Sequence, residues 1–215
     1  MNKECLKFQN RGWQREEKDL DFKHKAAVEL IEKGPILDIG CGGGLFLQYL
    51  KNRGIEGCGL DISDKAIELA KNRGIDCQIF DVSEKLPFED NAFEGVTLID
   101  VLEHLFMPEE ILKEAHRVAK KYLIFSAPNF VSLAARLQVL FGRVPENNTM
   151  RKAHILWATR KVLHQLLADA GFEVEKEIDD FFYADKLILG RIFKFLAKLR
   201  PEIFALSFII KAKKV

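Results

Sequence analysis

The chain has 215 residues, which is enough for one domain with a sizeable hydrophobic core. Hydrophobic residues make up 48% of it and charged residues 30%, which is ordinary for a globular protein. The formal net charge is +1, so no overall field attracts nucleic acid or an anionic membrane, and we expect no nucleic-acid partner.

Cysteine spacing and hydropathy bear on where the protein works. The spacing of the cysteines matches no zinc site and no disulfide framework, so we expect reduced thiols. The first ten residues lack the apolar stretch of a secretory signal, and no apolar run reaches the ~20 residues that span a bilayer. We therefore expect a cytoplasmic protein without stable membrane insertion. The cysteines are Cys5, Cys41, Cys58 and Cys77.

Strands and helices are expected to alternate through the first half of the chain. The first 33 residues are charged and carry a helical pattern, which predicts a helical lid. The expected elements are a helix over 14–32, strands over 35–40, up to Asp61, over 76–80, 94–99 and 122–126, and helices over 45–51, 63–70 and 108–120. This alternation predicts βαβ units and a parallel sheet.

The pattern changes beyond residue 130. We expect helices over 130–141, 159–170 and 187–199, a polar segment over 142–153, and strands over 172–178 and 206–213. The last two strands are joined by the segment that contains the helix over 187–199 rather than by another βαβ crossover, so we expect them to pair antiparallel. The whole chain is predicted to form one domain, with 130–157 and 181–203 as segments that cover it.

Each expected strand of the first half ends near an acidic residue. In an open parallel sheet, ligands bind in the crevice outside the carboxyl ends of the strands. One carboxylate there is unremarkable, whereas four at four strand ends indicate a common site. The four are Asp38, Asp61, Asp81 and Asp100.

A glycine run follows the first expected strand. Glycine allows a tight turn from strand into helix and lets a ligand approach the main chain. The spacing is G-x-G-x-G, at Gly40, Gly42 and Gly44. The dinucleotide fingerprint G-x-G-x-x-G would need a glycine at Leu45, and no Gly-Lys-Ser/Thr follows, which excludes a P-loop.

This pattern, with an acid two residues before the first glycine and another about twenty residues on, resembles the class I S-adenosylmethionine (SAM)-dependent methyltransferases. The resemblance covers roughly residues 35–180. It rests on the segments Ile36-Leu37-Asp38-Ile39-Gly40-Cys41-Gly42-Gly43-Gly44, Gly59-Leu60-Asp61-Ile62-Ser63, Asp81-Val82, and Leu86-Pro87-Phe88-Glu89-Asp90-Asn91-Ala92-Phe93-Glu94.

The resemblance implies a fold. It is an α/β, three-layer Rossmann-like sandwich with a seven-stranded, mostly parallel sheet in the order 3-2-1-4-5-7-6. Strand 7 is antiparallel, and helices cover both faces. This order agrees with the antiparallel ending expected from the sequence.

The resemblance also implies the cofactor and its contacts, with S-adenosylhomocysteine (SAH) as the product. The glycine loop would wrap the methionine end of SAM, and Asp38 would help to hold its amino group. Asp61 would accept hydrogen bonds from the ribose hydroxyls, and Asp81 with Val82 would meet the adenine. The full set of implied cofactor-binding residues is Asp38, Gly40, Cys41, Gly42, Gly44, Asp61, Ile62, Asp81, Val82 and Asp100.

The fourth strand is followed by Asp100-Val101-Leu102-Glu103-His104. If a helix starts here, Asp100, Glu103 and His104 lie on one face. Two carboxylates and an imidazole could take a proton from a substrate, bind a divalent cation, or only cap the helix and hold the loop. We assign His104 and Glu103 as catalytic residues and assign no metal ligand.

His154 and Trp157 lie between the core and the next expected helix. Such connections often cover the acceptor site, so we assign both residues to the substrate. A surface histidine and a packing tryptophan are the alternative.

The second half narrows the family and leaves two functions open. Segments around 126–145 and 199–205 resemble the methionine-biosynthesis MetW proteins, whereas the middle resembles ubiquinone- and menaquinone-type methyltransferases. The first function is methyl transfer to a small-molecule acceptor at oxygen. The alternative is a MetW-like SAM-binding partner or regulator of a methionine-biosynthesis enzyme, in which case a protein partner is implied.

Overall fold

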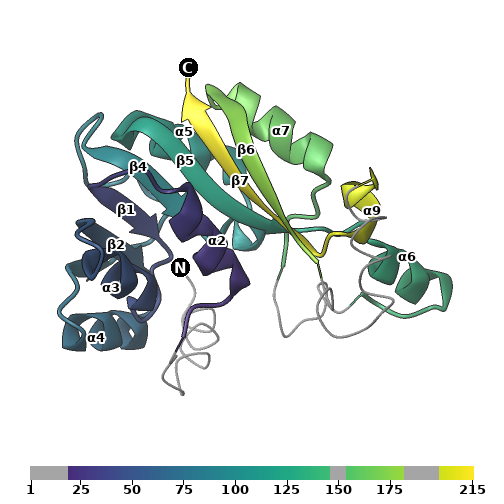
Figure 1. Cartoon of the computed structure of the whole chain (residues 1–215), viewed down its shortest axis with the longest axis horizontal. Coiled ribbons are helices and arrows are strands. Elements are labelled where there is room, and N and C mark those ends of the chain that lie inside the picture. The colour runs from purple at the N-terminus through teal and green to yellow at the C-terminus, as the bar shows by residue number, and fades with distance from the viewer. Residues whose placement is uncertain (1–18, 146–153, 182–198) are drawn as a thin grey trace.

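A computed structural model describes residues 19–145, 154–181 and 199–215. Its centre is a seven-stranded sheet in the order β3-β2-β1-β4-β5-β7-β6 (Figure 1). The first five strands pair parallel, and β7 is antiparallel to both of its neighbours, so the expected order and the expected antiparallel ending are confirmed. The strands are β1 (Ile36–Ile39), β2 (Gly57–Asp61), β3 (Cys77–Ile79), β4 (Phe93–Leu98), β5 (Ala119–Pro128), β6 (Phe172–Asp180) and β7 (Ser207–Lys214).

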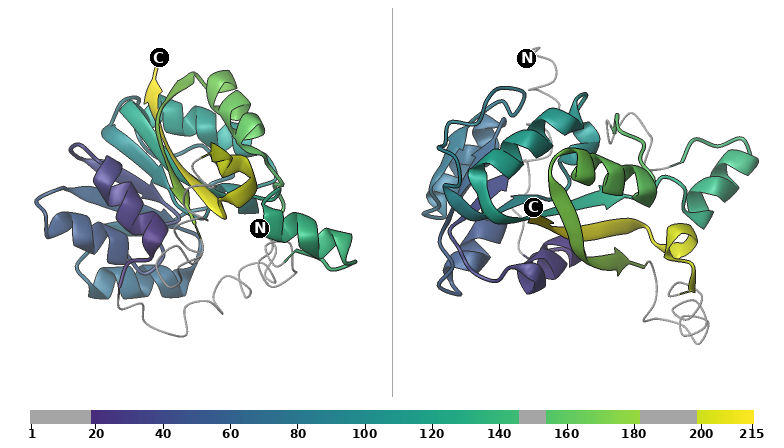
Figure 2. Two further views of the ribbon diagram at one scale, coloured as in Figure 1. Left: turned by 45° about the vertical axis from the view of Figure 1, so that its right-hand side comes forward. Right: turned by 90° about the horizontal axis from the view of Figure 1, so that it is seen from above.

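Helices cover both faces of this sheet, and each face has its own hydrophobic core. One core joins α5 and α7 to the sheet through side chains such as Leu112, Leu163 and Phe125. The other joins α2, α3 and α4 to the opposite face, through side chains such as Leu30 and Leu50. Figure 2 shows α5 and α7 on one side of the sheet and α2 on the other. The helices are α2 (Phe22–Leu30), α3 (Leu45–Lys51), α4 (Asp64–Asn72), α5 (Pro108–Val118), α6 (Leu133–Leu140), α7 (Arg160–Asp169) and α9 (Pro201–Phe204), with the 3₁₀ turn η1 (Leu102–His104). Within the described ranges, no helix has the length and apolar character needed to cross a membrane.

Hydroxyl caps explain where several helices begin. Ser63 accepts a hydrogen bond from the amide of Ala66, and Thr159 accepts one from Val162, so α4 and α7 start at the residues that follow. Each cap satisfies a main-chain donor that the first turn of a helix leaves without an intrahelical acceptor. Pro108 occupies the first turn of α5, where its missing N–H costs nothing.

Most boundaries fall within a few residues of those expected, but β5 differs more. The expected helix to Lys120 ends at Val118, and β5 begins at Ala119, which is fully buried and pairs with Phe93. Burial beside β4 therefore outweighs the helical pattern at this point. The short helix α9 was not predicted. Residues 14–18 of the expected helix over 14–32, and nearly all of the one over 187–199, lie outside the described residues. Residues 19–21 are not helical, because Asp21 caps α2, which begins at Phe22.

Asn129 joins the end of β5 to the chain that leads into β7. Its side chain is fully buried, and its Nδ2 donates to the carbonyls of Glu202 (2.9 Å) and Ala205 (2.8 Å). Its Oδ1 accepts from the amide of Val131 at 3.1 Å. The side chain therefore fixes both the exit of β5 and the approach to β7, beside which α6 and α9 lie together (Figure 1).

Replacement of Asn129 by alanine should destabilise the fold. It leaves one buried and two partly buried main-chain groups without the side chain that satisfies them, and we expect a loss of about 2–4 kcal/mol in the free energy of unfolding. Urea denaturation measures it. The matched control is Asn52→Ala at the exposed end of α3, which should cost under about 0.5 kcal/mol. Equal stability of the two variants would show that the hydrogen bonds of the Asn129 side chain do not stabilise the fold.

Candidate active site

A tight glycine turn leads from β1 into α3. Gly40, Gly42 and Gly44 all have positive φ angles, of 78°, 52° and 75°. A Cβ at Gly40 would lie 2.3 Å from Cγ2 of Val101, and one at Gly44 would lie 2.8 Å from Cβ of Ala70. Both the backbone conformation and the space therefore require glycine at these two positions.

The turn is fixed to β2 by main-chain hydrogen bonds. The amides of Gly40 and Cys41 both donate to the carbonyl of Leu60, at 2.7 and 3.0 Å. The Cys41 side chain is directed toward β2, where a Cβ at Gly59 would lie only 2.5 Å from its Sγ. Any contact of Cys41 with a cofactor would therefore come from its main chain. Burial raises the pKa of the Cys41 thiol, so it stays protonated.

Asp61, at the end of β2, accepts hydrogen bonds from two main-chain amides. Its Oδ2 accepts from Gly42 at 2.9 Å and its Oδ1 from Ser63 at 2.8 Å. Burial raises the pKa of Asp61, and these bonds oppose that rise. The carboxylate thus connects the glycine turn to the start of α4. Ile62 follows it and is half-buried.

Asp38, in β1, is almost completely buried. Its Oδ1 accepts a hydrogen bond of 2.6 Å from Oγ1 of Thr97 on the neighbouring strand β4. Burial raises the pKa of Asp38 to about 6, although the Thr97 hydroxyl and the nearby His24 act to lower it. A buried carboxyl with one hydroxyl partner is suited to a cationic ligand, because such a ligand would supply the charge that the protein does not.

Asp81 and Val82 follow β3 at the far side of the same edge. Oδ1 of Asp81 accepts from the amide and the hydroxyl of Ser83, at 3.1 and 2.7 Å. Val82 is half-buried against the core that α5 and α7 form with the sheet. The strand order β3-β2-β1-β4 therefore places the four predicted carboxylates in one row along the carboxyl ends of the strands. In order along this edge they are Asp81, Asp61, Asp38 and Asp100.

The helix that would have put Asp100, Glu103 and His104 on one face does not form. Asp100 has a φ of +57° and lies before a single 3₁₀ turn, η1, so it does not share a helix face with Glu103 and His104. Its amide donates to Oγ of Ser126 at 2.8 Å, and that hydroxyl donates to Oδ1 of Asp100 at 3.1 Å. Its carboxylate pairs with Lys23 of α2, a residue that the sequence did not indicate. These bonds to β5 and α2 hold Asp100 in the left-handed conformation.

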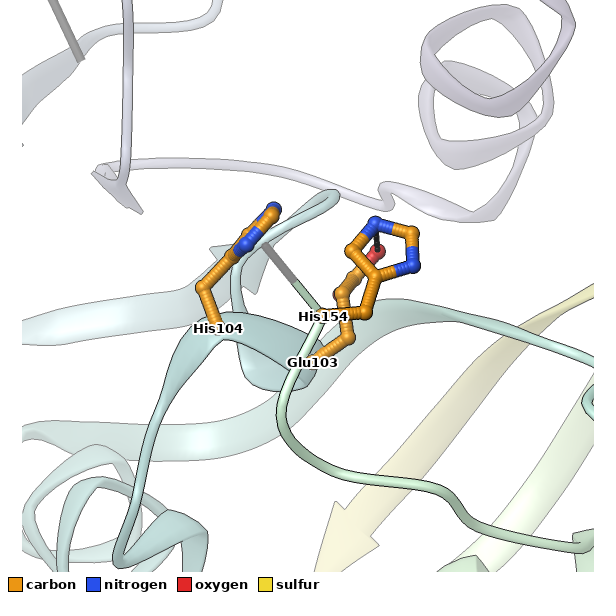
Figure 3. A group of neighbouring side chains, drawn as sticks. All are labelled: Glu103, His104 and His154. Atoms are coloured by element: carbon orange, nitrogen blue, oxygen red, sulfur yellow. Dashed lines mark ion pairs between the residues drawn. The ribbon is translucent and has the colours of Figure 1, made fainter. Parts of the chain in front are cut away.

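Glu103 and His104 of η1 come together with His154 (Figure 3). One nitrogen or oxygen from each side chain lies within 4.8 Å of the others, and Nε2 of His154 is 3.9 Å from Oε1 of Glu103. The two imidazole rings are 4.9 Å apart. Glu103 is 2% exposed, and both histidines are half-buried. Such a group could relay a proton or, with small side-chain movements, hold a divalent cation.

Main-chain bonds bring His154 to this group from far along the sequence. The carbonyl of Glu103 accepts from the amides of Ile155 (2.7 Å) and Leu156 (3.1 Å). Trp157 is 63% exposed, and its ring stacks on Phe130 at 6.1 Å. The two residues that were assigned to the substrate therefore lie on one segment beside Glu103.

Comparisons with known proteins agree with this arrangement. The model of a family described as "Methyltransferase domain" matches residues 11–177. Among solved structures, a SAM-dependent methyltransferase from Thermotoga maritima superposes with a TM-score of 0.66 at 23% identity, covering 90% of this chain and 88% of that one. Magnesium protoporphyrin IX methyltransferase from Synechocystis PCC 6803, with SAH bound, gives 0.67 at 17% identity, covering 100% and 96%. These two likenesses show the fold.

Curated relatives match over part of their length. The ubiquinone biosynthesis O-methyltransferase of Alkalilimnicola ehrlichii is 31% identical over 107 residues, which are 46% of this chain and 43% of that protein. The enzyme of the same name from Chromobacterium violaceum is 27% identical over 146 residues, 63% and 61% of the two chains. The match thus spans less than two thirds of each relative. The chain belongs to the methyltransferase domain family.

SAM binding should depend on pH through Asp38. With a pKa of about 6, Asp38 is partly protonated near pH 6 in the free protein, whereas the SAM ammonium group would favour its ionised form. Binding should therefore release a proton near pH 6 and almost none near pH 7.5, and the affinity should fall as the pH drops below about 6. Calorimetry in two buffers of different ionisation enthalpy measures this release. Asp38→Asn should abolish it, and a release that persists would assign the proton to another group.

Asp61→Asn should weaken SAM binding by about 1.5–3 kcal/mol, the scale of a charged hydrogen bond. Asparagine keeps the shape but provides one acceptor oxygen, while Asp61 already accepts from two amides with two oxygens. Calorimetry with SAM measures the change. Asp76→Asn, on the exposed residue before β3, is the matched control and should leave the affinity unchanged. Equal affinities would mean that Asp61 does not meet the ribose.

Proposed function

We propose that this protein transfers the methyl group of SAM to a hydroxyl oxygen of a small molecule. The observation that carries this proposal is the position of Glu103, His104 and His154 just beyond Asp100, at the β4 end of the row of carboxylates. A cofactor site and a proton-accepting group would thus adjoin at one edge of the sheet.

The row suggests how SAM would lie. Asp81 and Val82 would meet the adenine, Asp61 and Ile62 the ribose, and the turn over 40–44 the methionine end. Asp38 would hold the amino group. The sulfonium would then lie toward the end of β4, near Asp100, with its methyl group directed to the acceptor side.

The chemistry needs little from the protein beyond alignment and proton removal. The sulfonium already activates the methyl group, so the carbon–sulfur bond breaks as the carbon–oxygen bond forms. His104 would accept the hydroxyl proton and later release it to water, leaving SAH and a methyl ether. Glu103 would stabilise the imidazolium that forms, and His154 with Trp157 would line the acceptor side.

Oxygen as the accepting atom is supported by the curated relatives, which are named O-methyltransferases. A MetW-like SAM-binding partner of a methionine-biosynthesis enzyme is the competing function, and it would imply a protein partner. The group of Glu103, His104 and His154 favours the enzyme, because a pure binding protein needs no proton acceptor. The fold likeness does not discriminate between the two functions.

His104→Gln should lower the turnover number by roughly 100-fold or more, with little change in SAM affinity, because the variant loses the proton acceptor and keeps the cofactor site. The assay follows SAH release with a panel of phenols, catechols and primary amines. His164→Gln, on a half-exposed histidine of α7 that pairs with Glu177, is the matched control and should turn over normally. Wild-type binding of SAM without turnover of any hydroxyl acceptor would favour the partner protein.

The same assay separates a proton acceptor from a cation site. If His104 acts as a base, exhaustive treatment with EDTA should leave turnover unchanged. Loss of turnover that Mg²⁺, Mn²⁺ or Zn²⁺ restores would instead assign Glu103, His104 and His154 as ligands of that cation.

A further inference from the structure

Lys23 brings a positive charge to the edge of the sheet where the carboxylates gather. It lies near the start of α2, which begins after Asp21, and its ammonium group pairs with Oδ1 of Asp100, 77 residues later in the chain. Its side chain is 22% exposed and that of Asp100 37%, so the pair is only partly open to water. Helix α2 packs on β5, β6 and β7, and this packing fixes the position of Lys23 relative to the sheet.

Other carboxylates also surround this ammonium group. Burial lowers the pKa of Lys23, but Asp100, Glu103 and Asp21 together raise it above its ordinary value. Asp180, at the end of β6, also feels the positive charge of Lys23, which acts to lower its pKa against the effect of burial. Lys23 therefore stays charged and balances several acids that come from different elements.

The charge of the cofactor changes during the reaction. SAM carries a sulfonium, whereas SAH is neutral at sulfur and otherwise differs from SAM only by the methyl group. A bare carboxylate beside the sulfonium would stabilise bound SAM more than the transition state, in which this charge is being lost, and would therefore slow the transfer. Asp100 has that position if SAM lies along the row as proposed above.

We propose that Lys23 is a positioning residue that acts through Asp100: it neutralises the Asp100 carboxylate and so sets how strongly the site prefers SAM over SAH. This inference rests on the proposed placement of SAM. A merely structural role for Lys23 would change the affinities for SAM and SAH by the same factor. The ratio of the two dissociation constants therefore distinguishes the two roles.

The test is calorimetry with SAM and with SAH on the whole chain, near pH 7. Lys23→Met should tighten SAM about tenfold relative to SAH, which is the scale of the interaction between two unit charges about 10 Å apart at an effective dielectric constant of about 20. Asp100→Asn should shift the ratio in the opposite direction, because it leaves the Lys23 charge uncompensated. Asparagine tolerates the positive φ at this position, so the second variant keeps the backbone. The double variant should return the ratio toward the wild-type value.

The matched control is Lys25→Met, on the same helix, where the exposed ammonium pairs with Asp19 at 2.8 Å. It should leave the ratio unchanged. An unchanged ratio in both Lys23→Met and Asp100→Asn would overturn the inference, and so would shifts of the same sign. If the wild type binds neither SAM nor SAH, the proposed cofactor site itself fails, a result that is distinct from a constant ratio.

Discussion

Two hydrogen bonds, from the amides of Gly40 and Cys41 to the carbonyl of Leu60, determine the geometry of the whole functional edge. They hold the turn after β1 against the end of β2, and the Val101 side chain leaves no room for a Cβ at Gly40. The turn therefore keeps one shape. Because the strands that end around this turn are neighbours in the sheet, their pairing brings the acidic residues at these ends close to one another.

These carboxylates differ in the hydrogen-bond and ion-pair partners that stabilise their negative charge. Asp61 has two main-chain donors, Asp100 has a hydroxyl and an ammonium group, and Asp38 has the Thr97 hydroxyl and a raised pKa. The carboxyl with the least compensation is the one that the resemblance assigns to the cationic amino group of SAM. The Asp38 carboxylate is thus the least stabilised by the protein, at the position where a cationic ligand would supply the positive charge.

Much of this arrangement could be predicted from the sequence, for identifiable reasons. The glycine spacing and the acids at strand ends are local signals, and the resemblance to SAM-dependent methyltransferases gave the sheet order, which the structure confirms. The failures concern contacts between distant segments. No periodicity reports that Lys23 meets Asp100, or that the hydroxyl of Ser126 holds Asp100 outside a helix. Ala119 lies within a segment whose sequence pattern predicts a helix, but its pairing with Phe93 places it in a strand.

The bonds between the carbonyl of Glu103 and the amides of Ile155 and Leu156 have a mechanical consequence. The residue that supplies the buried carboxylate also anchors the segment that brings His154. Any movement that lifts this segment away to admit a bulky molecule must break these bonds and carry His154 off with it. Entry of a molecule by that route and an intact three-residue group would therefore exclude each other.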